Sequence, residues 1–134
     1  MATILIVDDD TDTREVLSRF IQREGYNTVT AANGWEALLA LDDHHVDLIL
    51  LDVMMPGMNG MTFLNILRNA QKKMKTPVVL VTAMSSDSIE TDARRLGVAE
   101  VVPKTQNLFN RLLPVIRRNL DTSGVVAAFD PDSN

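Results

Sequence analysis

Carboxylates follow two apolar runs of the chain in a pattern that could bind a metal ion. The run "TILIV" leads into Asp8, Asp9 and Asp10, and the run "LILL" ends on a single acid, Asp52. Two carboxylates about 4 Å apart repel by roughly 4 kcal/mol at an effective dielectric constant near 20. A cluster of such acids must hold a proton or bind a cation, and oxygen ligands favour Mg²⁺ or Mn²⁺. The acids at 8–10 alone are equally typical of a helix start, but Asp52 favours the metal site.

Two further polar residues follow later apolar runs. Thr82 comes after "PVVLV", and Lys104 comes after "VAEVVP". A hydroxyl and an ammonium beside a metal-binding acid cluster can bind the oxygens of a phosphoryl group. A carboxylate can itself be the nucleophile and form an aspartyl-phosphate. Either residue alone is typical of an ordinary strand end or surface position, so the combination favours phosphoryl chemistry.

Five short apolar runs predict the strands that must position these residues, and stretches with helical spacing lie between them. This alternation is typical of βαβ units. It predicts an α/β fold, a flavodoxin-like doubly wound five-stranded parallel sheet of order 2-1-3-4-5 with five helices. In that order the first and third strands are neighbours, so their terminal carboxylates converge at one edge of the sheet. The predicted strands are residues 3–7, 27–31, 46–51, 77–81 and 98–102.

Local signals indicate where the helices begin and end. Asp12 and Glu15 have the spacing of a capping box, and Gly25 and Gly97 are expected to end the first and fourth helices. Pro114 predicts a kink or a break in the fifth. Trp35 is expected to be partly buried at the start of the second. The predicted apolar faces are Val16, Leu17, Phe20 and Ile21; Ala37, Leu38 and Leu41; Phe63, Leu64 and Leu67; and Leu108, Leu112, Leu113 and Ile116.

Length and charge limit the classes of function. The chain has 134 residues, a net charge of −5 and no cysteine, so we expect one domain at residues 1–120 and a flexible tail or linker stub at 121–134. No basic stripe is available for nucleic acid. The N-terminal apolar run is too short for a signal peptide or a membrane span. We therefore expect a cytoplasmic protein without nucleic-acid or membrane contacts.

The set "ILIVDDD", "LILLDVMMPGMNG", "VVLVTAM" and "VVPK", in this order and spacing, resembles the receiver domain of bacterial two-component response regulators, of the chemotaxis-receiver type, over about residues 3–120. The resemblance implies that Asp52 accepts a phosphoryl group. It implies that Asp9 and Asp52 bind Mg²⁺ directly, with the backbone carbonyl of Met54 as a further ligand and Asp8 acting through water. Asp10 matches no required position and is expected to start a helix.

The resemblance also assigns the residues around the acceptor. Thr82 would be the switch hydroxyl, and Lys104 would pair with a phosphoryl oxygen. Small Ala83 would leave access to the acceptor, whose phosphoryl lifetime depends on flanking groups such as Met54 and Met84. The loop after the acceptor would be shaped by Pro56, Gly57 and Gly60.

Two positions depart from the family pattern. Val101 stands where many members carry an aromatic ring that moves with the switch hydroxyl. Thr105 stands where the lysine is usually followed by proline, often through a cis bond. Because a cis bond before a non-proline residue costs about 2.5–4 kcal/mol, we expect a trans bond, which could displace Lys104. Pro103 is tolerable because the fifth strand should lie at the sheet edge.

The resemblance implies a phosphorylation-controlled switch that is not an enzyme beyond assisting its own phosphorylation and dephosphorylation. The phosphoryl donor would be a histidine kinase or phosphotransfer protein. Output would be a protein contact through the fourth helix, fifth strand and fifth helix of a monomer or weak dimer, unless the chain is a fragment.

Other interpretations remain. One is a receiver-like adaptor independent of phosphate, and another is a small Mg²⁺-dependent phosphatase of the haloacid dehalogenase type, whose acid spacing Asp8 and Asp10 match. A calcium loop fails, because Thr13 and Arg19 stand where glycine and glutamate are needed.

Overall fold

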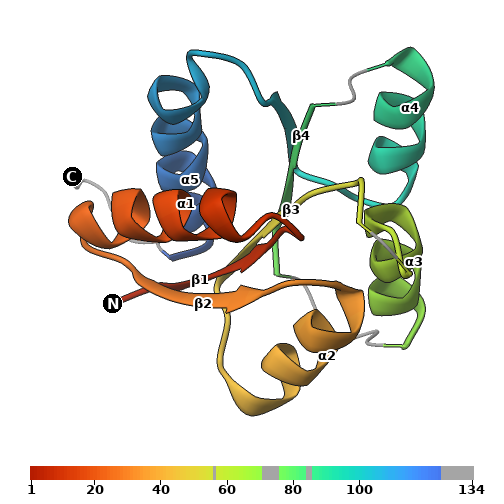
Figure 1. The fold of residues 1–134 in the computed structure, drawn as a ribbon, viewed down its shortest axis with the longest axis horizontal. Coiled ribbons are helices and arrows are strands. Elements are labelled where there is room, and N and C mark those ends of the chain that lie inside the picture. Colours follow the sequence, from red (N-terminus) through yellow and green to blue (C-terminus); the bar gives the residue numbers. More distant parts are fainter. Residues whose placement is uncertain (56, 71–75, 84–85, 125–134) are drawn as a thin grey trace.

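The sheet consists of five parallel strands in the order β2-β1-β3-β4-β5, which confirms the predicted topology (Figure 1). The computed structural model describes residues 1–55, 57–70, 76–83 and 86–124. Every strand end lies within two residues of its predicted position, and β5 is an edge strand as expected. The strands are β1 Thr3–Val7, β2 Asn27–Ala31, β3 Leu48–Leu51, β4 Val78–Thr82 and β5 Glu100–Pro103.

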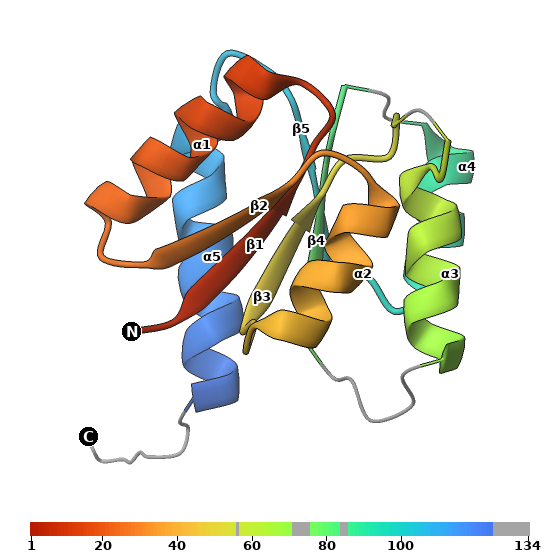
Figure 2. The same cartoon turned by 60° about the horizontal axis from the view of Figure 1, so that its bottom comes forward.

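Helices cover both faces of the sheet, with α1 and α5 on one face and α2, α3 and α4 on the other (Figure 2). Side chains alternate along each strand, so the sheet carries two cores. On the α1–α5 face, Ile4 and Ile6 pack with Leu112 and Ile116. On the opposite face, Leu5 packs in a cluster with α2 and α3 residues. The helices are α1 Thr11–Arg23, α2 Gly34–Asp43, α3 Gly60–Ala70, α4 Asp87–Arg95 and α5 Leu108–Gly124.

The start of α1 corrects one prediction. Asp10, and not an Asp12–Glu15 capping box, caps this helix: its Oδ2 accepts the backbone N–H of Thr13 at 2.9 Å. The helix begins at Thr11, so Asp12 already lies inside the first turn. Val16 also departs from its predicted place on the apolar face, because half of it is exposed.

The helix ends at glycines agree with prediction, because Gly25 and Gly97 follow α1 and α4 with positive φ angles of 96° and 79°. The fifth helix has no break at Pro114, because α5 continues through this residue to Gly124. Residues 121–124, which were expected to begin the tail, are therefore helical. Leu112 and Ile116 are fully buried on either side of the proline, and this packing offsets the hydrogen bond that proline cannot donate. Residues 125–134 lie outside the described part of the chain.

Within the described residues, no helix is long and apolar enough to span a bilayer.

Candidate functional site

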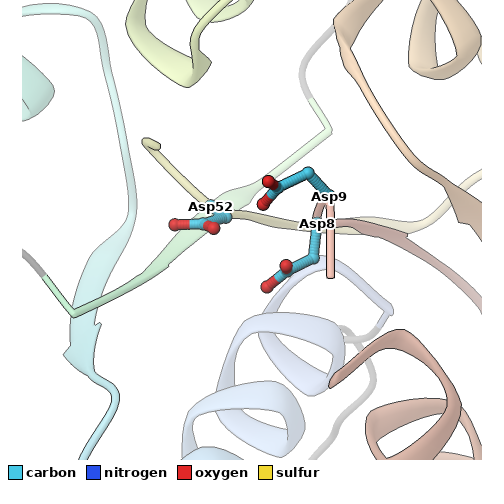
Figure 3. A group of neighbouring side chains, drawn as sticks. All are labelled: Asp8, Asp9 and Asp52. Carbon is cyan, nitrogen blue, oxygen red and sulfur yellow. The ribbon is translucent and has the colours of Figure 1, made fainter. Parts of the chain in front are cut away.

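Asp8 and Asp52 lie at the carboxyl ends of β1 and β3, which are neighbouring strands of the sheet. Val7 pairs with Leu51 in the parallel register, and the backbone N–H of Asp52 donates to the carbonyl of Val7 at 2.9 Å. The next residue of each strand end therefore carries a carboxylate to the same edge. One carboxylate oxygen from each of Asp8, Asp9 and Asp52 lies within 4.8 Å of the others (Figure 3). The predicted convergence of these three acids is what the structure shows.

The three acids differ in exposure. Asp8 and Asp52 are buried, with 2% and 6% of their surface exposed, whereas Asp9 is exposed. Asp8 is held by specific bonds: its Oδ1 accepts the backbone N–H of Asp10 at 2.9 Å, and its Oδ2 accepts from Lys104 at 2.7 Å. The site thus has a fixed acid on its inner side and a solvent-facing acid on its outer side.

Lys104 reaches both buried carboxylates from the end of β5. Its Nζ lies 2.7 Å from Asp8 Oδ2 and 3.3 Å from Asp52 Oδ2. The backbone N–H of Lys104 donates to the carbonyl of Thr82 at 2.9 Å, and the next N–H, of Thr105, donates to Pro103 at 3.0 Å. No cis peptide bond occurs among the described residues. The trans bond expected before Thr105 is therefore present, and it does not displace the lysine from the site.

Electrostatics at the site oppose a fully ionised cluster. Burial raises the pKa of the Asp52 carboxyl above its ordinary value, and the charge of Asp8 raises it further, although Lys104 opposes the rise. Burial acts to lower the pKa of Lys104, but the hydrogen bond and charge of Asp8, with help from Asp52, outweigh it and raise that pKa. The lysine is therefore firmly cationic, and an added cation beside Asp52 would favour its charged form.

Thr82 lies beside this group, fully buried at the end of β4. It pairs in register with Pro103, so its backbone and that of Lys104 are directly linked across the sheet edge. Ala83 follows it and is exposed. Met84 and Pro56 lie outside the described residues.

The loop after Asp52 is shaped by close backbone approach. The Met54 N–H donates to Asp52 Oδ1 at 3.3 Å, a long bond. Gly57 has a positive φ of 77°, which favours glycine. A Cβ on Gly60 would lie 2.4 Å from the Asp52 carbonyl oxygen, so only glycine lets α3 begin this close to the end of β3. The predicted roles of both glycines in shaping this loop agree with the structure.

The donor set fits a hard divalent cation. Three carboxylates offer oxygen atoms from two adjacent loops, and oxygen ligands, with space for water on the exposed side at Asp9, are what Mg²⁺ and Mn²⁺ require. The raised pKa of Asp52 points the same way, because a bound cation would favour its charged form.

Sequence reasoning missed one residue that supports the site. The Nη1 of Arg14, on α1, donates to the backbone carbonyl of Asp8 at 2.7 Å, and its Nη2 donates to the Thr11 hydroxyl at 3.3 Å. This guanidinium ties the acid-bearing loop to the first turns of the helix. An arginine one turn into a helix that follows a cluster of acids is a signal that could have indicated it.

The structure defines the class of fold as a doubly wound α/β domain with acids, a hydroxyl and a lysine at the carboxyl edge of its sheet, and comparison with known proteins identifies the family. The family model "Response regulator receiver domain" matches residues 4–117. The chain therefore belongs to the response regulator receiver domain family. This membership favours the receiver interpretation over the phosphatase alternative.

Similarity to individual proteins agrees with this family membership. The chain is 38% identical over 122 residues to the transcriptional regulatory protein CpxR of Escherichia coli K12, covering 89% of this chain and 51% of that protein. It is 35% identical over 130 residues to the CpxR homolog of Haemophilus influenzae, covering 95% of this chain and 56% of that protein. The chain thus spans about half the length of these curated relatives.

Solved structures show the same fold over almost their whole length. The chemotaxis protein CheY4 of Vibrio cholerae superposes with a TM-score of 0.83 at 32% identity, covering 90% of this chain and 99% of that one. The response regulator TrrA of Thermotoga maritima, solved in complex with Mg²⁺ and BeF, superposes with a TM-score of 0.79 at 35% identity, covering 90% and 100%. The chain is thus a receiver domain of a two-component response regulator.

Proposed function

We propose that Asp52 is the phosphoacceptor of this receiver domain and that its acyl phosphate controls a signalling contact. One observation carries the proposal: the Asp52 carboxylate is buried at the end of β3, 3.3 Å from the Lys104 ammonium, in a cluster with Asp8 and Asp9. The phosphoryl donor is a phosphohistidine of a histidine kinase or a phosphotransfer protein.

Transfer of the phosphoryl group is a displacement at phosphorus. An Asp52 carboxylate oxygen attacks phosphorus, a P–O bond forms, and the P–N bond to the donor imidazole breaks, leaving its electron pair on nitrogen. Lys104 moves from Asp52 to a phosphoryl oxygen, and the Thr82 hydroxyl donates a hydrogen bond to another. Hydrolysis of the acyl phosphate then resets the domain, which turns over no separate metabolite.

Mg²⁺, or Mn²⁺, would be held directly by Asp9, Asp52 and the backbone carbonyl of Met54, with Asp8 acting through a bound water. A cation there would neutralise the carboxylates and the phosphoryl oxygens. The oxygen donor set of this chain and the Mg²⁺ in the related TrrA complex support this assignment.

Output passes through α4, β5 and α5, in a monomer or weak dimer in the cytoplasm. The direct backbone link between Thr82 and Lys104 offers a route to β5 that needs no large ring at Val101. Couplings of this kind are typically about 1–3 kcal/mol. The curated relatives are transcriptional regulators, but this acidic stretch is proposed to signal through a protein and not to touch nucleic acid.

The test is phosphorylation by a small acyl-phosphate donor with Mg²⁺, followed by intact mass measurement. We expect the wild type to gain the mass of one phosphoryl group. This added mass should be absent when a chelator removes the metal, and it should be absent from Asp52→Asn. Asp10→Asn is the matched control: it changes a neighbouring acid that caps α1, and asparagine caps as well as aspartate, so labelling should persist.

Other outcomes separate the alternatives. No adduct on either protein, with metal binding intact, would contradict the proposal and favour an adaptor that works without phosphate. An adduct that persists in Asp52→Asn would move the chemistry to the acids after β1.

A further inference from the structure

The outward face of α2 carries two large apolar side chains that the fold does not use. Trp35 is 64% exposed and Leu39 is 66% exposed, so the partial burial expected of Trp35 is wrong. The packed side of the same helix is already complete, because Ala37 is fully buried and Leu38 and Leu41 pack against the core cluster. Trp35 and Leu39 are therefore surface residues by position and not core residues that failed to pack.

The same face becomes acidic toward the end of the helix. Trp35, Leu39, Asp42 and Asp43 are spaced four, seven and eight residues from the first, which places them along one side of α2. Asp42 and Asp43 are exposed, and the last turn of α2 holds no basic residue. We name these four residues the α2 outer face. It spans about 12 Å of helix at 1.5 Å per residue.

The acidic end is electrostatically unfavourable as it stands. A helix carries partial negative charge at its C-terminus, so carboxylates there are unfavourable and cations are favoured. Within the described residues, neither Asp42 nor Asp43 makes an ion pair or side-chain hydrogen bond. A cation placed beside these residues would be attracted both by the carboxylates and by the helix end.

We propose that the α2 outer face docks a cationic amphipathic helix of another protein, with apolar side chains over Trp35 and Leu39 and lysine or arginine over Asp42 and Asp43. The proposal does not depend on phosphorylation of Asp52. The face lies on a helix separate from the α4, β5 and α5 elements proposed for output (Figure 2).

Charge argues against the other occupants. In a two-fold dimer through this face, antiparallel α2 helices would bury Asp42 and Asp43 against Trp35 of the other copy, and parallel helices would place acid against acid. The residues that follow α5, 125–134, contain Asp130 and Asp132 and no lysine or arginine, so they supply no cation. Anionic lipid and nucleic acid would be repelled.

The test uses the full chain and two synthetic helical peptides of about 18 residues, one of leucine and lysine and one of leucine and glutamate. Trp35 is the only tryptophan, so its emission reports directly on the face. We expect the lysine peptide to cause a saturable blue shift that weakens with salt, and to shift amide resonances of ¹⁵N-labelled protein along α2. The glutamate peptide should cause neither.

Variants separate site binding from general attraction to an acidic protein. Leu39→Ser should weaken binding about tenfold, as loss of a central apolar contact does. Asp42→Asn with Asp43→Asn should weaken it at least about fivefold and flatten the salt dependence. Val16→Ser is the matched control, because Val16 is a half-exposed apolar residue on α1. This variant should bind the lysine peptide with the same affinity as the wild type. Circular dichroism would check that each variant is folded.

Any of the following results would overturn the proposal. One is equal binding of the glutamate peptide. Another is a loss in Val16→Ser as large as in Leu39→Ser, or amide shifts centred away from α2. The last is a blue shift that grows with protein concentration in the absence of peptide, which would assign the face to a second copy of the chain.

Discussion

Replacing Asp52 by asparagine should stabilise the domain when no divalent cation is bound. Burial and the Asp8 charge raise the pKa of Asp52, which means that the fold disfavours its ionised form relative to the unfolded chain. Asparagine removes the charge and keeps an oxygen that can accept the Met54 N–H. The variant that abolishes the proposed phosphorylation is therefore expected to be the more stable protein.

The gain in stability is a small difference between two larger, opposing interactions of the Asp52 carboxylate. Asp8 and Asp52 oxygens within 4.8 Å repel by about 3.5 kcal/mol at an effective dielectric constant near 20, whereas Lys104 at 3.3 Å attracts Asp52 by about 5 kcal/mol. Desolvation of Asp52 turns this balance against the charge, as the direction of the pKa shift indicates. We expect a gain on the order of 1 kcal/mol, or about 3–5 °C in Tm for a domain of this size.

The assay is urea unfolding followed by far-ultraviolet circular dichroism at pH 7 and low salt with chelator. Glu15→Gln is the control, since Glu15 is exposed on α1, and it should lie within about 0.5 kcal/mol of wild type. Adding Mg²⁺ should stabilise the wild type more than Asp52→Asn, because ligand binding to the folded state adds stability.

The effect of pH on the stability difference between Asp52→Asn and the wild type follows from the direction of the pKa shift. Because the folded pKa of Asp52 is raised, its cost to stability is fully present above that pKa and disappears as falling pH protonates the group in the folded state. The advantage of Asp52→Asn should therefore shrink toward acid pH. If Asp52→Asn is no more stable than wild type at pH 7 in chelator, while Glu15→Gln behaves as expected, the buried Asp52 charge does not destabilise the fold and the reasoning is refuted.

Three further changes test the surrounding structure. Gly60→Ala should lower the free energy of unfolding by about 1–3 kcal/mol, because its Cβ would lie 2.4 Å from the Asp52 carbonyl oxygen; denaturant melts measure this, and an unchanged midpoint would contradict it. Arg68→Met should cost about 1–3 kcal/mol, since the guanidinium donates to two backbone carbonyls at the end of α4 at 3.1 and 3.2 Å, and amide exchange should quicken there first. Glu100→Gln should lower Tm at pH 7, because the Arg118 hydrogen bond lowers the pKa of Glu100. That loss should shrink as pH falls below the ordinary glutamate pKa and vanish only below the lowered pKa of the folded state.

The topology and the acid cluster could be predicted because they follow from chain order. Continuous apolar runs separated by helical stretches leave few alternatives to a parallel sheet, and order 2-1-3-4-5 places β1 beside β3. Asp8 and Asp52 directly follow those strands, so their meeting needs no knowledge of side-chain packing. Gly60 could likewise be read from turn chemistry.

The helix start, the course of α5 and the position of Lys104 depend on three-dimensional packing, which a short sequence pattern does not specify. The capping-box spacing of Asp12 and Glu15 competes with Asp10, and the actual cap depends on where α1 leaves the site. Pro114 is accommodated by the packing of residues far away in sequence. The residue that follows Lys104, Thr105, does not determine where the lysine side chain lies. That position is set by the ion pairs of Lys104 with Asp8 and Asp52, which are 96 and 52 residues away in the sequence.

These ion pairs also bear on how a switch at this site would work. Lys104 extends from the edge strand β5 to acids at the ends of β1 and β3, so one cation joins both ends of the site. A phosphoryl group on Asp52 would compete with Asp8 for the same ammonium, and Asp8, being buried, would need a cation in its place. Occupancy of the proposed metal site and the position of β5 would therefore be coupled through a single side chain. We therefore expect Lys104→Met to weaken the coupling between phosphorylation of Asp52 and the elements α4, β5 and α5 more than it weakens metal binding. Amide chemical shifts of β5, with and without BeF and Mg²⁺, would measure the change.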